Sequence, residues 1–111
     1  MESLSRVTAA TVDVLKSLIG AGEATWGLRI VKEAGRPPGT VYPVLDRLER
    51  AGWVVSAWED DAGRAGPRRR LYELTADGAI AATSMVAEFK ARVRVRPVPS
   101  PAAVRATAAR A

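Results

Sequence analysis

Two stretches of helical periodicity meet at a four-residue turn, Gly35-Arg36-Pro37-Pro38. Gly35 ends the first stretch, because glycine readily adopts the left-handed backbone that follows a helix. Pro38 suits the first position of the next helix, where a missing N–H costs nothing. The turn therefore predicts two helices that meet at a tight corner.

A further helix is predicted before this pair, over Thr8–Ile19, and Gly20 and Gly22 stop it. The helix that ends at Gly35 begins with Thr25 as its N-cap, since a threonine hydroxyl can accept from an unpaired backbone N–H. The expected buried positions of these two helices are Val12, Val14, Leu15, Leu18 and Ile19, then Ile30, Val31 and Ala34.

The helix that begins at Pro38 runs to about Ala51 and is stopped by Gly52. Pro43 lies inside it, which normally costs about 3 kcal/mol. The cost is smaller here, because the carbonyl that loses its bond belongs to Gly39 in the first turn. The apolar stripe of this helix is Val41, Val44, Leu45 and Leu48.

A hairpin and a last helix follow. Trp53–Trp58 is aromatic and β-branched, Glu59–Gly66 is a polar loop with two glycines, and Arg69–Leu74 is the return strand. Thr75 is the expected N-cap of a helix that continues to about Val93. A short heptad stripe runs along this helix through Ala79, Ala82, Val86, Phe89 and Val93.

Three helices, a hairpin and a helix make a mostly helical α+β fold, a winged helix-turn-helix with an added C-terminal helix. The domain boundaries expected are 1–7 for an N-terminal extension, 8–74 for the winged helix-turn-helix, 75–93 for the last helix and 94–111 for a flexible basic tail. In this fold the third helix enters the major groove of DNA and the hairpin forms a wing beside it.

The composition excludes several kinds of chemistry. The chain has no Cys and no His, so disulfides, Cys/His zinc sites and Ser-His-Asp triads are excluded. Three consecutive acids, Glu59 to Asp61, point in different directions on a strand end and do not by themselves form a metal site. We expect no catalytic residue, no metal and no cofactor, and a protein that stays in the cytoplasm and off the membrane.

The net charge of +5 comes from the stretch of the chain after Glu88. Six cations follow Glu88, the last acid of the chain, and without them residues 1–88 carry −1. Any claim of nucleic-acid binding must therefore rest on the placement of charges rather than on their sum.

Two segments carry a family resemblance. Pro38–Gly52 reads PGTVYPVLDRLERAG, and Gly66–Gly78 reads GPRRRLYELTADG. Together they closely resemble the PadR family of bacterial transcriptional regulators, in its short form with one C-terminal helix. The chain departs from the family pattern at Pro37, where a capping Ser is usual, and at Leu28, Arg29 and Trp53.

The resemblance implies a homodimeric repressor that binds an inverted repeat in double-stranded DNA. It also makes the C-terminal helix a dimerisation helix, which builds the dimer together with the first helix, and it allows a small hydrophobic or phenolic effector. The heptad stripe of Ala79, Ala82, Val86, Phe89 and Val93 independently fits a surface that seeks a partner. The residues expected to contact DNA are Arg36, Pro38, Gly39, Thr40, Tyr42, Arg47, Arg64, Arg68 and Arg69.

Several of these residues have a second interpretation. Packing is the alternative role for Tyr42 and support of the turn for Thr40, and Arg47 has Asp46, Glu49 and the wing acids as ion-pair partners. The three tryptophans are expected in core or hairpin packing, with a planar ligand as the alternative. A winged helix that binds another protein and not DNA is the competing function.

Overall fold

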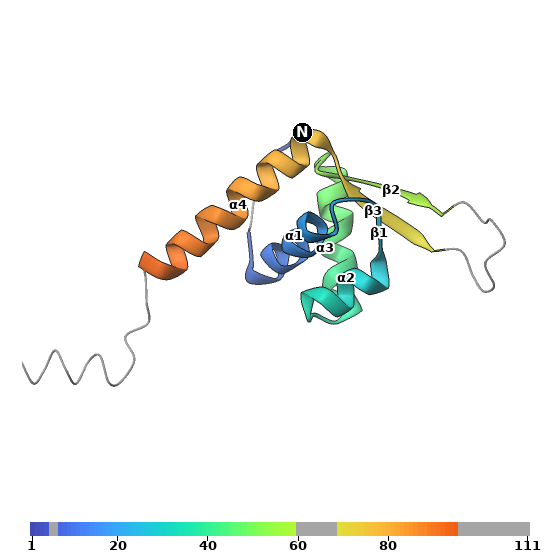
Figure 1. Cartoon of the computed structure of the whole chain (residues 1–111), viewed down its shortest axis with the longest axis horizontal. Coiled ribbons are helices and arrows are strands. Elements are labelled where there is room, and N and C mark those ends of the chain that lie inside the picture. The colour runs from blue at the N-terminus through green and yellow to red at the C-terminus, as the bar shows by residue number, and fades with distance from the viewer. Residues whose placement is uncertain (5–6, 60–68, 96–111) are drawn as a thin grey trace, which may run out of the picture.

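The structure is a computed structural model and describes residues 1–4, 7–59 and 69–95. Its elements are α1 (Ala9–Ala21), β1 (Thr25–Trp26), α2 (Gly27–Ala34), α3 (Pro38–Arg50), β2 (Val54–Trp58), β3 (Arg70–Leu74) and α4 (Ala76–Val95). In Figure 1, α4 leaves the helical body on one side and the β2–β3 hairpin leaves it on the opposite side. The mostly helical α+β prediction is confirmed. The predicted hairpin loop from residue 60 on, and the tail from residue 96 on, lie outside the described residues.

The first helix is longer than predicted. It ends at Gly22, whose φ of 66° is the left-handed conformation that glycine allows. Gly20 lies inside the helix, and nothing in the described part of the chain lies within 4 Å of the position a Cβ would take there. The inward face agrees with the expected one at Val12, Val14, Leu15 and Leu18, which are buried, and differs at Ile19, which is 36% exposed.

The N-terminus of α1 is capped by Thr8, whose Oγ1 accepts from the Thr11 N–H at 3.2 Å. We expect Thr8→Ala to lower the free energy of unfolding by about 1 kcal/mol, because the Thr11 donor then loses its partner. Urea denaturation followed by circular dichroism measures the loss. Thr83→Ala is the matched control, since Thr83 is exposed on α4 and its hydroxyl donates to the Ala79 carbonyl of its own helix. Equal losses in the two variants would contradict the capping role.

The prediction that Thr25 caps the second helix is wrong. Thr25 is buried in β1 opposite Tyr72, and α2 begins at Gly27 after Trp26, which makes no side-chain capping bond. Pairing with a distant strand decides the conformation of Thr25, and a local capping preference cannot anticipate that partner. The helix ends as predicted, with Gly35 in the left-handed conformation.

The sheet has three strands among the described residues, not the two expected. The order is β1-β3-β2, and both pairs are antiparallel. In the wing, Val54 pairs with Leu74 and Trp58 with Arg70. Because β1 leads directly into α2, the sheet joins the wing to the helix-turn-helix.

One core connects the helices and the sheet. It includes the whole predicted α3 stripe, Tyr72 from β3, and Ala82 and Val86 from α4. Burial raises the pKa of the Tyr72 hydroxyl. The buried side chains are Val12, Val14, Leu15, Leu18, Ile30, Val41, Val44, Leu45, Leu48, Ala51, Trp53, Val54, Tyr72, Ala82 and Val86.

The heptad stripe of α4 needs a correction. Ala82 and Val86 are buried in this chain's own core, so they are not available to a partner subunit. Ala79 is half-buried, and Phe89 packs at the edge of the same core. Val93 remains 60% exposed. Heptad spacing marks a helix face that packs on another helix, and the spacing alone does not say whether that helix belongs to the same chain.

Candidate nucleic-acid interface

The outer side of α3 is exposed among the described residues. Its apolar stripe is turned to the core, while Pro38, Gly39, Pro43 and Arg47 are exposed. The helix begins at Pro38 as predicted, and Pro43 lies inside it without ending it. A helix held by one face and bare on the other has the form needed to enter a groove.

The first turn of α3 is uncapped and open. Pro37, at the N-cap, supplies no side-chain hydrogen bond, although its carbonyl accepts from Thr40 and Val41 at 2.9 and 3.0 Å. The Gly39 N–H belongs to the first-turn donors that have no acceptor within a helix. Apart from the neighbouring residues and backbone of α3 itself, no atom of the described residues lies within 4 Å of where a Cβ on Gly39 would stand. A backbone donor in such open space is suited to an anion.

Tyr42 is half-buried and packs against the start of α2. A Cβ added to Gly27 would lie 2.7 Å from the Tyr42 hydroxyl, so glycine at that position makes room for the ring. Tyr42 therefore has the packing role that the sequence analysis gave as its alternative interpretation. Thr40 is also half-buried, next to the exposed Gly39. The DNA contacts expected of Thr40 and Tyr42 stay predictions.

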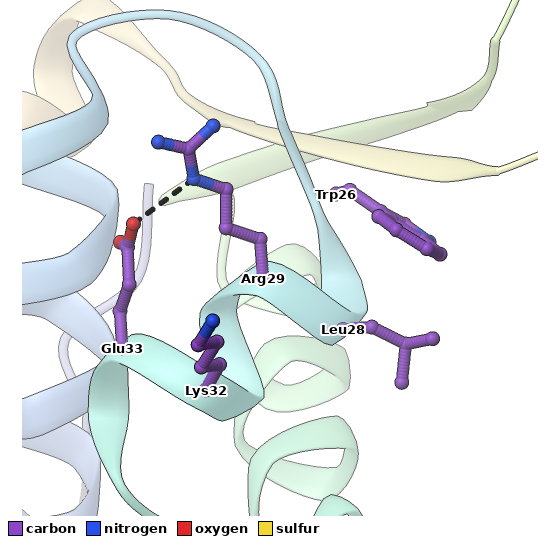
Figure 2. Close-up of a pocket in the computed structure, with 5 residues that line it drawn as sticks. All are labelled: Trp26, Leu28, Arg29, Lys32 and Glu33. Atoms are coloured by element: carbon purple, nitrogen blue, oxygen red, sulfur yellow. Dashed lines mark hydrogen bonds and ion pairs between the residues drawn. The ribbon is translucent and has the colours of Figure 1, made fainter.

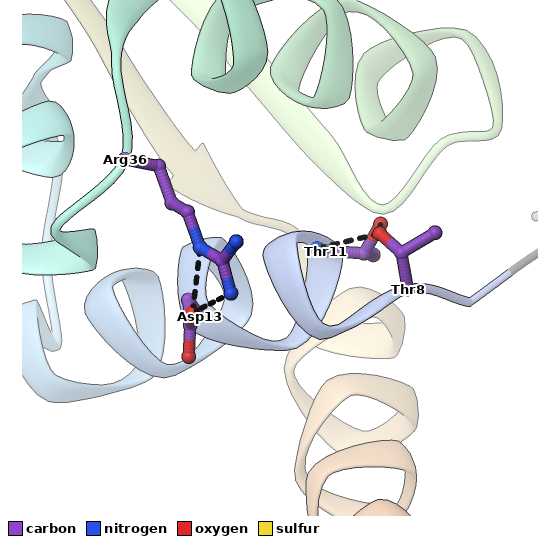
Figure 3. A network of polar contacts seen from close by, with 4 residues as sticks. All are labelled: Thr8, Thr11, Asp13 and Arg36. Atoms are coloured by element: carbon purple, nitrogen blue, oxygen red, sulfur yellow. Dashed lines mark hydrogen bonds and ion pairs between the residues drawn. The ribbon is translucent and has the colours of Figure 1, made fainter.

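Arg36 is engaged inside the protein (Figure 3). Its Nη2 lies 2.9 Å from Asp13 Oδ2, and its Nε donates to the same oxygen at 3.0 Å. The pair fastens the turn between α2 and α3 to α1. Sequence reasoning missed Asp13, because an ion pair across 23 positions leaves no local pattern.

The Arg47 guanidinium makes no hydrogen bond or ion pair within the described residues. Two of the carboxylates expected to compete for it have other partners, since Asp46 lies 3.0 Å from Arg50 Nη2 and Glu49 accepts from Ser56 at 2.6 Å. The wing acids Asp60 and Asp61 lie outside the described residues. Arg47 is therefore an exposed cation on the outer side of α3, available to a phosphate or a base edge.

Of the four arginines of the wing, two lie outside the described residues and two contact a tryptophan. Arg64 and Arg68 lie outside the described residues. The Arg69 guanidinium stacks on the Trp26 ring, with Cζ 3.8 Å from the ring centroid. Arg70 donates to Ser56 Oγ at 2.7 Å and lies 5.2 Å from the ring centroid of Trp58.

The three tryptophans have different surroundings. Trp53 is buried in the core, as the packing prediction has it, and its Nε1 donates to the Glu2 carbonyl at 2.6 Å. Trp26 is half-buried under Arg69. Trp58 lies in the hairpin next to Arg70, but its side chain is 58% exposed, so its packing there is slight.

A pocket of about 670 Å³ lies against α2 (Figure 2). Trp26 and Leu28 form its apolar side, and Leu28 is 48% exposed. On the other side, Arg29 donates to Glu33 at 3.0 Å. This bond, with a second from Ser17, lowers the pKa of the Glu33 carboxyl. Lys32 lines the pocket and has no partner in the described part of the chain.

Residues 1–4, 7–59 and 69–95 hold neither a metal-binding cluster nor a membrane span. No group of three or more acidic, His or Cys side chains in these ranges is arranged to hold a metal ion. No helix of this part has both the length and the apolar character to cross a bilayer.

Together, the tight α2–α3 turn, the bare outer side of α3 and the β2–β3 wing define a winged helix-turn-helix. The sequence profile of the transcriptional regulator PadR-like family matches residues 14–84. The chain belongs to this family of transcriptional regulators, which are DNA-binding proteins and not enzymes. No curated protein sequence matches it significantly.

Solved structures show the same fold. The chain is 26% identical to Bordetella bronchiseptica BpsR, whose DNA binding is regulated by 6-hydroxynicotinic acid, with a TM-score of 0.67 and coverage of 94% of this chain and 71% of that one. A PadR family regulator from Clostridium difficile is 22% identical, with a TM-score of 0.59 and coverage of 79% and 90%. Streptomyces coelicolor PcaV, solved with its natural ligand, is 23% identical, with a TM-score of 0.68 and coverage of 93% and 70%.

Proposed function

We propose that this chain is a cytoplasmic repressor that binds an inverted-repeat operator as a homodimer. The observation that carries the proposal is the uncapped first turn of α3, where Gly39 offers its backbone in open space and Arg47 follows on the outer side. Each subunit would place α3 in a major groove and its wing beside it. Membership of the family supports the same function.

The dimer would form through the part of α4 that the chain's own core leaves uncovered. Ile80 is 71% exposed and Val93 60% exposed, and both are large apolar side chains on this helix. In the proposed dimer the partner subunit would cover these side chains. Ala82 and Val86 hold α4 to the body, so the spacing of the two recognition helices would depend on α4.

A small effector is the third part of the proposal. Two proteins of the same fold support it: BpsR, whose DNA binding is regulated by 6-hydroxynicotinic acid, and PcaV, which was solved with its natural ligand. The pocket beside Trp26 joins an apolar wall to Lys32, a cation that is unpaired among the described residues, and this combination is suited to a small aromatic acid.

The test is a gel-shift titration with DNA from upstream of the protein's own gene, repeated at several salt concentrations. We expect one segment to bind at least about 10³-fold more tightly than shuffled DNA. The logarithm of its binding constant should fall linearly with the logarithm of salt concentration, because phosphate contacts release counterions.

A variant with Arg96, Arg105 and Arg110 changed to Gln is the control, because it removes tail charge and leaves α3 and the wing intact. Its sequence preference should persist even where its overall affinity falls. A DNA affinity that depends neither on the DNA sequence nor on the salt concentration would favour the alternative function, a winged helix that docks on another protein.

A further inference from the structure

Arg69 has a different environment from that expected of a DNA contact. Its guanidinium lies over the Trp26 ring, 3.8 Å from the centroid, and its Nε is buried with no acceptor among the described residues. The charge is thus turned to an indole face of the same chain. We propose that Arg69 is a positioning residue, which acts through Trp26 to set the direction of the wing, and that it does not contact DNA.

The path from Trp26 to the recognition helix is short. Trp26 is the last residue of β1 and the N-cap of α2, and α2 joins α3 through the tight turn at Arg36. On the other side, Trp26 pairs with Leu71 of β3. The ring that Arg69 covers therefore stands where the wing meets the helix-turn-helix.

The backbone of Arg69 is held as well. The Glu59 N–H donates to the Arg69 carbonyl at 2.8 Å, and the Arg69 N–H donates to Glu59 Oε1 at 3.3 Å. The first of these bonds continues the β2–β3 ladder one step beyond the strands, and the second adds the Glu59 side chain to the same contact. Arg69 consequently ties both wing strands to Trp26, because its backbone bonds the end of β2 while its side chain lies on β1.

Arg70 is a useful contrast on the same strand. Its ring partner, Trp58, lies farther away at 5.2 Å and belongs to the wing itself. The Trp58–Arg70 contact joins two strands of the wing, whereas the Trp26–Arg69 stack joins the wing to the helix-turn-helix. Removal of Trp58 therefore provides a matched control, since it deletes an indole beside an arginine without freeing the wing from α2.

The inference rests on the proposed function, and its test separates positioning from contact. DNA affinity and its salt dependence are measured for Arg69→Ala, Arg69→Met, Trp26→Ala, Trp26→Phe and the Trp26→Ala/Arg69→Ala double variant. We expect Arg69→Ala and Trp26→Ala each to weaken binding on the order of fivefold, and the double variant to lose no more than either one. Arg69→Met and Trp26→Phe should restore most of the affinity, because a long apolar chain or another ring still packs there.

The salt slope distinguishes a lost phosphate contact from a misplaced wing. If Arg69 contacted a phosphate, the fall of the logarithm of the binding constant with the logarithm of salt concentration would be less steep by about 0.9 in Arg69→Met. If Arg69 only positions the wing, the steepness stays the same in that variant. Additive losses in the double variant, full affinity in Trp26→Ala, or a reduced slope in Arg69→Met would each overturn the proposal. Arg69→Ala should cost the same in a Trp58→Ala background as in the wild type.

Hydrogen exchange in the free protein separates this inference from the function on which it rests. Arg69→Ala should speed exchange of the backbone amides of the β1–β3 pair, with or without DNA. If the wild type binds no DNA but this effect is seen, the proposed function fails while the link between Arg69 and Trp26 stands. Unchanged exchange would overturn the link itself.

Discussion

Gly78→Ala is expected to lower the free energy of unfolding by about 3 kcal/mol or more. A Cβ on Gly78 would collide with the Trp53 carbonyl oxygen and lie 2.8 Å from Thr75 Oγ1. That carbonyl accepts from the Thr75 N–H at 2.9 Å, and Thr75 Oγ1 in turn accepts from the Gly78 N–H at 2.9 Å. The methyl would push the start of α4 away from the body and break these bonds. Urea unfolding followed by circular dichroism measures the effect.

The matched control is Gly20→Ala, another glycine-to-alanine change within a helix. Nothing in the described residues lies within 4 Å of its Cβ position, so alanine should leave stability unchanged or raise it by up to about 1 kcal/mol. A Gly78→Ala variant as stable as this control would show that α4 does not dock on the Trp53 backbone as described.

Gly39→Ala should weaken operator binding by about tenfold, on the order of 1.4 kcal/mol, without destabilising the fold. Gly39 stands in open space in the first turn of α3, so a methyl clashes with nothing in the described part of the free protein. Alanine is also the better helix former. On DNA the same methyl would hold the helix N-terminus away from a phosphate. Operator titration and urea unfolding of one preparation measure the two effects.

Gly20→Ala serves again as the control for binding, because α1 presents no predicted DNA contact. Its affinity should equal that of the wild type. Full operator affinity in Gly39→Ala would refute a close approach of DNA to this backbone, even if the protein binds DNA by other residues. A loss of stability in the same variant would refute the open space described around Gly39.

Most of the helical fold was predictable because its signals are local. The α3 stripe from Val41 to Leu48, its start at Pro38 and the stop at Gly35 depend on neighbours within a few positions. The wing strands follow in the same way from the aromatic and β-branched residues of Trp53–Trp58. The family was predictable for the same reason, because each of its two motif segments is continuous along the chain.

The candidate site was less predictable, because its contacts join distant parts of the chain. From the sequence alone, every basic residue near the recognition helix or in the wing is an equally good candidate for a DNA contact. The sequence does not show which residues lie beside it in space. The structure separates these cases: Arg36 is paired with Asp13, Arg69 is stacked on Trp26, and Arg47 is unpaired within the described residues.

The sequence by itself determined the class of the protein, the order of its helices and wing strands, and the segment that begins the recognition helix. Only the tertiary structure decided that Thr25 forms a third strand, that Ala82 and Val86 belong to this chain's core, and that Arg69 faces Trp26. The physical reason is the range of the forces involved. Helix periodicity and end signals act over a few residues, whereas strand pairing, core packing and ion pairs depend on partners that only the folded chain brings together.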